Sequence, residues 1–100
     1  MKQREIKFRA FENEKMHYFD LSDTIAPSTG MKVMQFTGLF DKNGKEIYEG
    51  DIMKRIYKYE VRFDKGRFYL HHKSGHHVKN GFDIDFEIIG NIHEHKHLLK

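Results

Sequence analysis

Residues 36–54 read FTGLFDKNGKEIYEGDIMK, and two glycine steps within this stretch decide how the chain turns. Asn-Gly is the strongest short signal for a β-hairpin, because both central residues of a type I′ turn need positive φ. Asn43 and Gly44 therefore predict a type I′ hairpin between strands within residues 31–40 and 45–48. Gly50 follows shortly after, and its polar neighbours predict another turn with positive φ at this glycine.

Upstream of this stretch, a strand and its return are predicted. Residues 5–10 alternate strictly, which would place Ile6, Phe8 and Ala10 on one half-buried face of a strand. A polar turn then leads into residues 16–19, which can form the partner strand.

Downstream, the same kind of pattern continues. Residues 56–63 alternate and would direct one set of side chains to a common face: Tyr57, Tyr59, Val61 and Phe63. A turn at Gly66 leads into a strand at 68–70. Gly90 interrupts a last strand, which predicts a bulge or a sharp bend there.

Short strands separated by glycine turns predict a mainly β protein, built as a small antiparallel barrel or sandwich. The only proline lies in the polar segment 21–30, which we expect to be a loop or linker. We therefore divide the chain into an N-terminal hairpin and linker region, residues 1–33, and a compact β domain, residues 34–100.

Composition narrows the class of protein. Hydrophobic residues make up only 38% of the 100 residues and mean hydropathy is −0.78, so a monomer would have a thin core. The absence of cysteine excludes disulfides and thiolate metal ligands. Apolar runs are much shorter than a membrane span, and the charged N-terminus does not read as a signal peptide. We expect a soluble intracellular protein.

The chain resembles the YopX family of phage and prophage proteins in three blocks that keep this order: REIKFRA at 4–10, MQFTGL leading into DKNGKEIYEGDI at 34–52, and IIGNI at 88–92. It departs from the family pattern at Phe11, where Trp is frequent, and in the histidine-rich segment 93–97. The resemblance implies a phage or prophage origin, an SH3-like barrel or roll in the C-terminal part, and self-assembly. It carries no established catalytic residues.

Glu49 and Asp51 raise the hypothesis of paired carboxylates for general acid–base catalysis. The alternative is that both acids flank and support the turn at Gly50. No nucleophile with a base and no phosphate-binding loop accompanies them, so we interpret the Glu-Gly-Asp step as structural. We predict that the protein is not an enzyme and has no catalytic residue and no cofactor. A hydrolase with an active site at Glu49 and Asp51 is kept as the last alternative.

Eight histidines raise the question of a metal site. Two groups have suitable spacing: His93, His95 and His97 on one side of a predicted strand, and His71, His72, His76 and His77 around a turn. Three imidazoles can hold zinc. Lysines lie among both groups and no acidic second shell is evident, so we predict no metal site.

Segment 54–79 carries eight Lys and Arg residues against only two acids. The cations alternate with aromatic residues, which suits phosphate contact and base stacking. The alternative is that the rings face the core while the cations form a solvated outer face. The candidate nucleic-acid-binding residues are Lys54, Arg55, Lys58, Arg62, Lys65, Arg67 and Lys73.

We therefore expect a phage-encoded accessory or interaction protein without catalytic activity, located in the cytoplasm of its bacterial host and working as a homo-oligomer. Fourteen aromatic residues exceed what a small barrel can hold inside, and exposed apolar patches usually mark contact surfaces. Non-specific nucleic-acid binding through segment 54–79 is the alternative. No membrane partner and no small-molecule substrate is expected.

Overall fold

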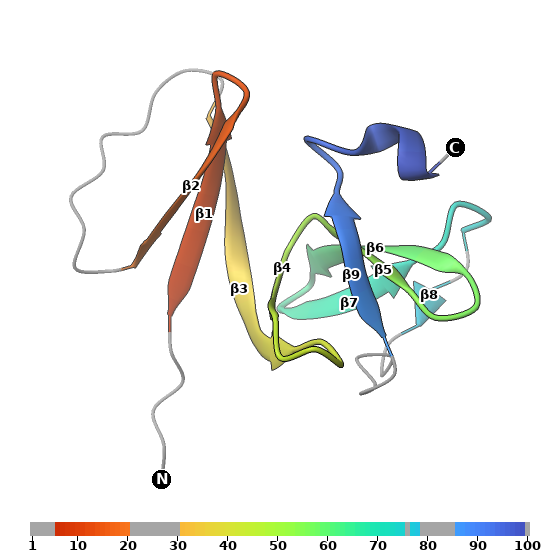
Figure 1. The fold of residues 1–100 in the computed structure, drawn as a ribbon. Helices are drawn as coiled ribbons and strands as arrows, with labels where there is room; N and C mark the ends of the chain where they lie inside the picture. Colours follow the sequence, from red (N-terminus) through yellow and green to blue (C-terminus); the bar gives the residue numbers. More distant parts are fainter. Residues whose placement is uncertain (1–5, 21–30, 76, 79–85, 100) are drawn as a thin grey trace, which may run out of the picture.

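The computed structural model describes residues 6–20, 31–75, 77–78 and 86–99. These residues form antiparallel strands joined by turns, with one short 3-10 helix near the C-terminus (Figure 1). The predicted mainly β fold class is therefore confirmed. The predicted loop at 21–30 lies outside the described residues.

The first sheet has the strand order β2-β1-β3-β4. Its strands are β1 (Lys7–Glu12), β2 (Lys15–Asp20), β3 (Lys32–Phe40) and β4 (Glu46–Tyr48). β3 pairs with β1 on one side and with β4 on the other. The division proposed between residues 33 and 34 thus falls inside β3, and the N-terminal hairpin continues into the same sheet as β4.

The second sheet has the strand order β8-β7-β6-β5-β9. Its elements are β5 (Asp51–Lys54), β6 (Lys58–Asp64), β7 (Arg67–His71), β8 (His77–Val78) and β9 (Glu87–Asn91), followed by the 3-10 helix η1 (Lys96–Leu99). Pairing in the described residues gives two sheets and no closed barrel, so the SH3-like barrel stays a prediction. No helix in the described part is long and apolar enough to cross a membrane.

The chain passes from the first sheet to the second within residues 36–54. Only Glu49 and Gly50 separate the end of β4 from the start of β5, and Figure 1 shows the two sheets side by side around this step. Gly50 has φ +89°, as predicted. Its backbone is fixed to the second sheet: its N–H donates to Val61 O (2.8 Å) and its carbonyl accepts from Ile92 N (2.9 Å).

The hairpin at Asn43 and Gly44 forms, but the predicted type I′ turn is wrong. Only Gly44 has positive φ. Its N–H donates to Asp41 O (3.0 Å), while Asp41 N–H donates to Lys45 O (2.9 Å), which is a three-residue loop with a glycine bulge. Asp41 is the reason, because its Oδ1 accepts from both Asn43 N and Lys45 N and holds the loop in this form.

Two-residue loops with positive φ at both positions occur at the β1–β2 and β6–β7 hairpins. Asn13 and Glu14 join β1 to β2 with φ of 52° and 64°, and Lys65 and Gly66 join β6 to β7 with φ of 52° and 81°. These are the dihedral signs of a type I′ turn. Both hairpins were predicted, although without this turn type.

The predicted bulge near Gly90 is confirmed. Ile52 lies opposite Gly90 and Met53 opposite Ile88, so Ile89 is an extra residue in β9. A Cβ at position 90 would lie 2.8 Å from the ring of His95. Glycine therefore allows the C-terminal turn to fold closely over β9.

Gly44 and Gly50 form a matched pair for a stability test. Both have positive φ, but a Cβ at Gly44 meets nothing within 4 Å, whereas one at Gly50 would lie 2.9 Å from Met34 Sδ. We expect Gly44→Ala to lower the free energy of unfolding by about 1 kcal/mol. Gly50→Ala should cost about 1–2 kcal/mol more, because Met34 must also move. Urea denaturation measures both, and equal losses would contradict the close packing at Gly50.

The hydrophobic core lies between β4 and the second sheet. It consists of Ile47, Met53, Val61, Leu70 and Phe86, and side chains packed against it are Tyr59, Phe68 and Ile88. The face predicted for β6 is only partly buried. Its middle residues meet the core, but the ends do not: Tyr57 is 60% and Phe63 45% exposed.

The alternation predicted for β1 is present, but the face that meets the second sheet is the one with Arg9 and Phe11. Arg9 forms an ion pair with Asp51, and the ring of Phe11 stacks on His93 with centroids 5.3 Å apart. Ile6 and Phe8 lie on the opposite side. A charged residue turns inward because its charge has a buried partner, which alternation alone does not reveal.

Candidate functional site

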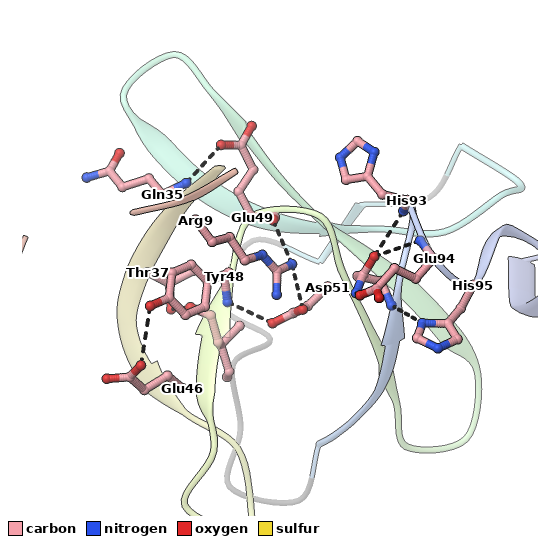
Figure 2. A network of polar contacts seen from close by, with 12 residues as sticks. Arg9, Gln35, Thr37, Glu46, Tyr48, Glu49, Asp51, His93, Glu94 and His95 are labelled. Atoms are coloured by element: carbon pink, nitrogen blue, oxygen red, sulfur yellow. Dashed lines mark hydrogen bonds and ion pairs between the residues drawn. The ribbon is translucent and has the colours of Figure 1, made fainter. Parts of the chain in front are cut away.

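Arg9 and Asp51 are the two most deeply buried charged residues in the described part of the chain. Arg9 Nη2 lies 2.8 Å from Asp51 Oδ1, and the two side chains are only 5% and 3% exposed. The same Nη2 donates to the carbonyl of Glu49 at 3.2 Å. Figure 2 shows the guanidinium of β1 reaching across to the β4–β5 step. The pair therefore joins the two sheets at the point where the chain crosses between them.

Tyr48 completes this junction. Its N–H donates to Asp51 Oδ2 at 2.7 Å, and its ring lies 4.9 Å from Arg9 Cζ, a cation–π distance. Its hydroxyl donates to Glu46 Oε1 at 3.3 Å. Burial and the charge of Glu46 raise the pKa of Tyr48 to about 12. The phenol is therefore protonated at neutral pH and is no ready base or nucleophile.

Burial raises the pKa of Asp51, and the Arg9 charge and the Tyr48 N–H oppose this increase. Arg9 Nε has no hydrogen-bond partner among the described residues. The two opposite charges are closely paired and mostly shielded from water. Removing only one of them would leave the other unpaired in the interior, which lowers the free energy of unfolding strongly. This arrangement is suited to holding two sheets in register.

Glu49 points away from Asp51. Its Oε1 accepts from Gln35 N at 3.5 Å, and its own N–H donates to Gln35 O at 2.9 Å, so it interacts with β3 (Figure 2). The two acids proposed as a catalytic pair thus have different partners and do not face a common position. This geometry favours the structural interpretation of the Glu-Gly-Asp step.

A recess of about 240 Å³ opens beside the junction and is lined by Arg9, Tyr18, Lys45, Glu46, Asp51 and His95, among others. Charges of both signs line it, so it favours no single class of ligand.

The segment 93–97 does not form the strand that would have aligned its histidines. β9 ends at Asn91, whose Oδ1 accepts from His93 N (3.0 Å) and Glu94 N (2.9 Å) and turns the chain. His95 Nδ1 in turn accepts from Asn91 N at 3.1 Å. Within the described residues no group of three potential ligands could hold a metal ion. Burial, followed by the charges of Arg9 and Lys32, lowers the pKa of His93.

The other histidine group is only partly described. His71 lies opposite His77 in the β7–β8 pairing, and His72 Nδ1 lies 2.8 Å from Ser74 Oγ. His76 and the side chain of His77 lie outside the described residues, so convergence of the four stays untested.

The structure separates the candidate nucleic-acid-binding residues into two ends of β6. Lys54, Arg55 and Lys58 surround the β5–β6 turn, and Lys65 and Arg67 surround the β6–β7 turn. Lys73 follows β7 on the side of the first group. Arg62 lies between them and pairs with Glu60 at 3.1 Å; hydrogen bonds to Glu60 raise its pKa. The seven residues therefore do not form one continuous stripe.

Sequence reasoning did not single out Arg9 or Asp41, although both organise the fold. Asp41 Oδ2 accepts from Ile88 N at 3.1 Å, which ties the β3–β4 loop to β9. The available signal was that both residues lie inside or beside the blocks that carry the family resemblance. Neither block reveals which distant group each side chain contacts.

Comparisons with known proteins agree with this fold. Residues 21–100 match the family model described as YopX protein. A search of curated proteins finds no match. The crystal structure of protein EF1440 from Enterococcus faecalis is similar, with a TM-score of 0.67 and 27% sequence identity, covering 95% of this chain and 98% of that chain. The similarity thus spans nearly the whole length of both chains.

Proposed function

The chain belongs to the YopX family, and we propose that it is an interaction protein without catalytic activity, working as a homo-oligomer. The family resemblance supports a phage or prophage origin and, with it, a location in the cytoplasm of a bacterial host. The SH3-like roll over residues 34–100 is part of the same proposal. The antiparallel second sheet would supply its strands from β5 onward.

The lack of catalysis is supported by the chemistry of the Arg9–Asp51 junction. Asp51 is committed to a buried ion pair, Glu49 is directed to β3, and Tyr48 is protonated at neutral pH. A general acid–base mechanism needs groups that reach a common substrate atom. These side chains instead hold the two sheets together.

The proposal of self-association rests on apolar side chains on the outer face of the first sheet, the face turned away from the second sheet. The β1 pairings place Phe8 opposite Phe19 and Ala10 opposite Val33, so these apolar residues share one face, on which Ala10 is buried and both phenylalanines are half-buried. Phe8 and Phe19 stack at 5.5 Å. Val33 is 51% exposed, and Ile6, which immediately precedes β1, is 44% exposed. An apolar face of this kind is typical of a contact surface.

The edge of the same sheet favours a second copy of this chain as the partner. β2 lies at the end of the strand order and pairs only with β1 among the described residues. An edge strand offers backbone donors and acceptors to another strand. Two copies related by a twofold axis can pair β2 with β2 and bring their outer faces together.

Val33→Asp tests this proposal. Light scattering at micromolar concentration should report a mass well above the 12.1 kDa of one chain for the parent protein. The substitution places a charge on the exposed outer face and should reduce the mass to that of a monomer that keeps its β structure by circular dichroism.

Ile56→Asp is the matched control. Ile56 is 77% exposed and lies in the turn between β5 and β6, away from the first sheet, so its replacement should leave the oligomer intact. If light scattering shows that the parent protein is a monomer, the proposal of a homo-oligomer is wrong. An oligomer that persists in Val33→Asp would show that another surface forms it.

A further inference from the structure

The turn between β5 and β6, residues 54–58, concentrates positive charge at one end of the second sheet; we refer to it as the β5–β6 tip. Lys54 and Lys58 lie directly opposite each other in the strand pairing, and Arg55 lies in the turn between them. Like charges opposite each other across two strands repel. This placement does not serve the stability of the hairpin.

Lys73 extends the same cluster to a third strand. Glu60 lies opposite His71 in the β6–β7 pairing, and continuing this register beyond the end of β7 brings Lys73 next to Lys58. Lys54 and Lys58 lie on neighbouring strands, which are about 4.8 Å apart, and Lys58 and Lys73 line the same recess. All three are exposed.

Two acids on the neighbouring strands already have other partners. Glu87 lies opposite Lys54 on β9, but its carboxylate is 3.7 Å from Lys42 Nζ and 3.3 Å from Asn43 Nδ2. Glu60 is paired with Arg62. Within the described part of the chain, no ion pair involves the three lysines of the cluster, so their charge is not neutralised there.

An exposed aromatic ring lies within the same cluster. Tyr57 is 60% exposed, and its ring meets that of His72 edge-on, with centroids 5.6 Å apart. A recess of about 240 Å³ beside it is lined by Ile56, Tyr57, Lys58, His72, Lys73 and the end of η1. An exposed ring beside several cations is the combination that binds stacked bases and phosphates of a single strand.

We propose that the β5–β6 tip binds single-stranded nucleic acid, with a base stacked on Tyr57 and phosphates contacted by Lys54, Lys58 and Lys73. A single strand is favoured over a duplex because the face of a base is accessible only when it is unstacked. This goes beyond self-association and uses the second sheet, so either proposal can fail without the other.

The test is a fluorescence anisotropy titration with a labelled oligothymidylate of about 15 nucleotides, within the usual range of site sizes. Lys54→Gln with Lys58→Gln should weaken binding at low salt. Because two phosphate contacts are removed, the double variant should also reduce the slope of log affinity against log salt by about 1.4. Tyr57→Ala should weaken binding about tenfold, the effect of one lost stacking contact.

The other end of β6 supplies matched controls. Lys65→Gln with Arg67→Gln removes the same charge, and Phe63→Ala removes an exposed ring that is packed against Phe68 at 4.8 Å. Both should retain most of the affinity of the parent. Thermal unfolding of Lys54→Gln with Lys58→Gln should show no loss of stability, since the opposed lysines repel each other.

The outcomes separate the alternatives. No binding of the oligonucleotide at low salt overturns the proposal, as does equal weakening by the two double variants, which would indicate unspecific attraction. If a duplex of equal length binds more tightly than the single strand, the proposed stacking of a base on Tyr57 is wrong. Binding to vesicles of anionic phospholipid but not to the oligonucleotide would identify a membrane surface as the partner instead.

Discussion

Asp51→Asn is expected to lower the free energy of unfolding by about 3–5 kcal/mol, because it leaves a buried guanidinium without its counter-charge. Both side chains of the pair are almost fully buried, so water cannot replace the lost contact between Arg9 Nη2 and Asp51 Oδ1. Urea denaturation at neutral pH measures the loss. Glu49→Gln is the matched control, since Glu49 has a single long contact to Gln35 N, and it should change stability by less than about 0.5 kcal/mol.

The double variant Arg9→Met with Asp51→Leu tests whether the two residues act as a pair. It should lose much less stability than the sum of Asp51→Leu and Arg9→Met, because no unpaired charge remains in the junction. Strictly additive losses would refute the coupling between Arg9 and Asp51.

Asp41→Ala is expected to lower the free energy of unfolding by about 2–4 kcal/mol, since hydrogen bonds to a charged group are worth about 1.5–3 kcal/mol each and water replaces part of them. Three backbone donors lose their acceptor: Asn43 N and Lys45 N at 2.9 Å, and Ile88 N at 3.1 Å. The first two shape the β3–β4 loop, and the third joins it to β9. Asp64→Ala, at the exposed end of β6, is the control and should cost less than about 0.5 kcal/mol.

The contribution of Asp41 should depend on pH. Burial alone would raise the pKa of Asp41, but the donors Ile88 N, Lys45 N and Asn43 N, with the charge of Lys45, hold it below the usual 3.8. A carboxylate with a depressed pKa in the folded state stabilises fully above the unfolded pKa and loses this effect as pH falls through the folded value. The stability difference between the parent and Asp41→Ala should therefore shrink below about pH 4. A difference that stays constant in acid would contradict this role.

Local patterns predicted most strands and turns because these depend on neighbours in the chain. Alternation located β1 and β6, and the polar residues around Asn13 and Gly66 located two hairpins. β5 was missed, because four residues are too few to show alternation. The turn type at Gly44 was wrong because the side chain of Asp41 satisfies the loop donors and selects a longer loop.

The candidate site was less accessible to prediction than the strands. Glu49 and Asp51 were noticed for their spacing, but their different partners depend on β3 and β1, which lie far away in the sequence. The basic residues of segment 54–79 were also recognised together. Their separation into two groups, one at each end of β6, follows from the strand pairing. The number of charges in the segment does not reveal this pairing.

By itself, the sequence determined the mainly β class, the family and the turns at Asn13, Gly44, Gly50 and Gly66, since each depends on residues that are adjacent in the chain. The turns at 55–57 and after Asn91 were predicted as strands. Only the tertiary structure decided that Arg9 is buried, that Asp41 bridges two sheets, and that Lys54 and Lys58 face each other across a turn. The physical reason is that the energy of a charge depends on its surroundings: the same side chain is solvated on a surface, or paired inside, according to which distant segment folds against it.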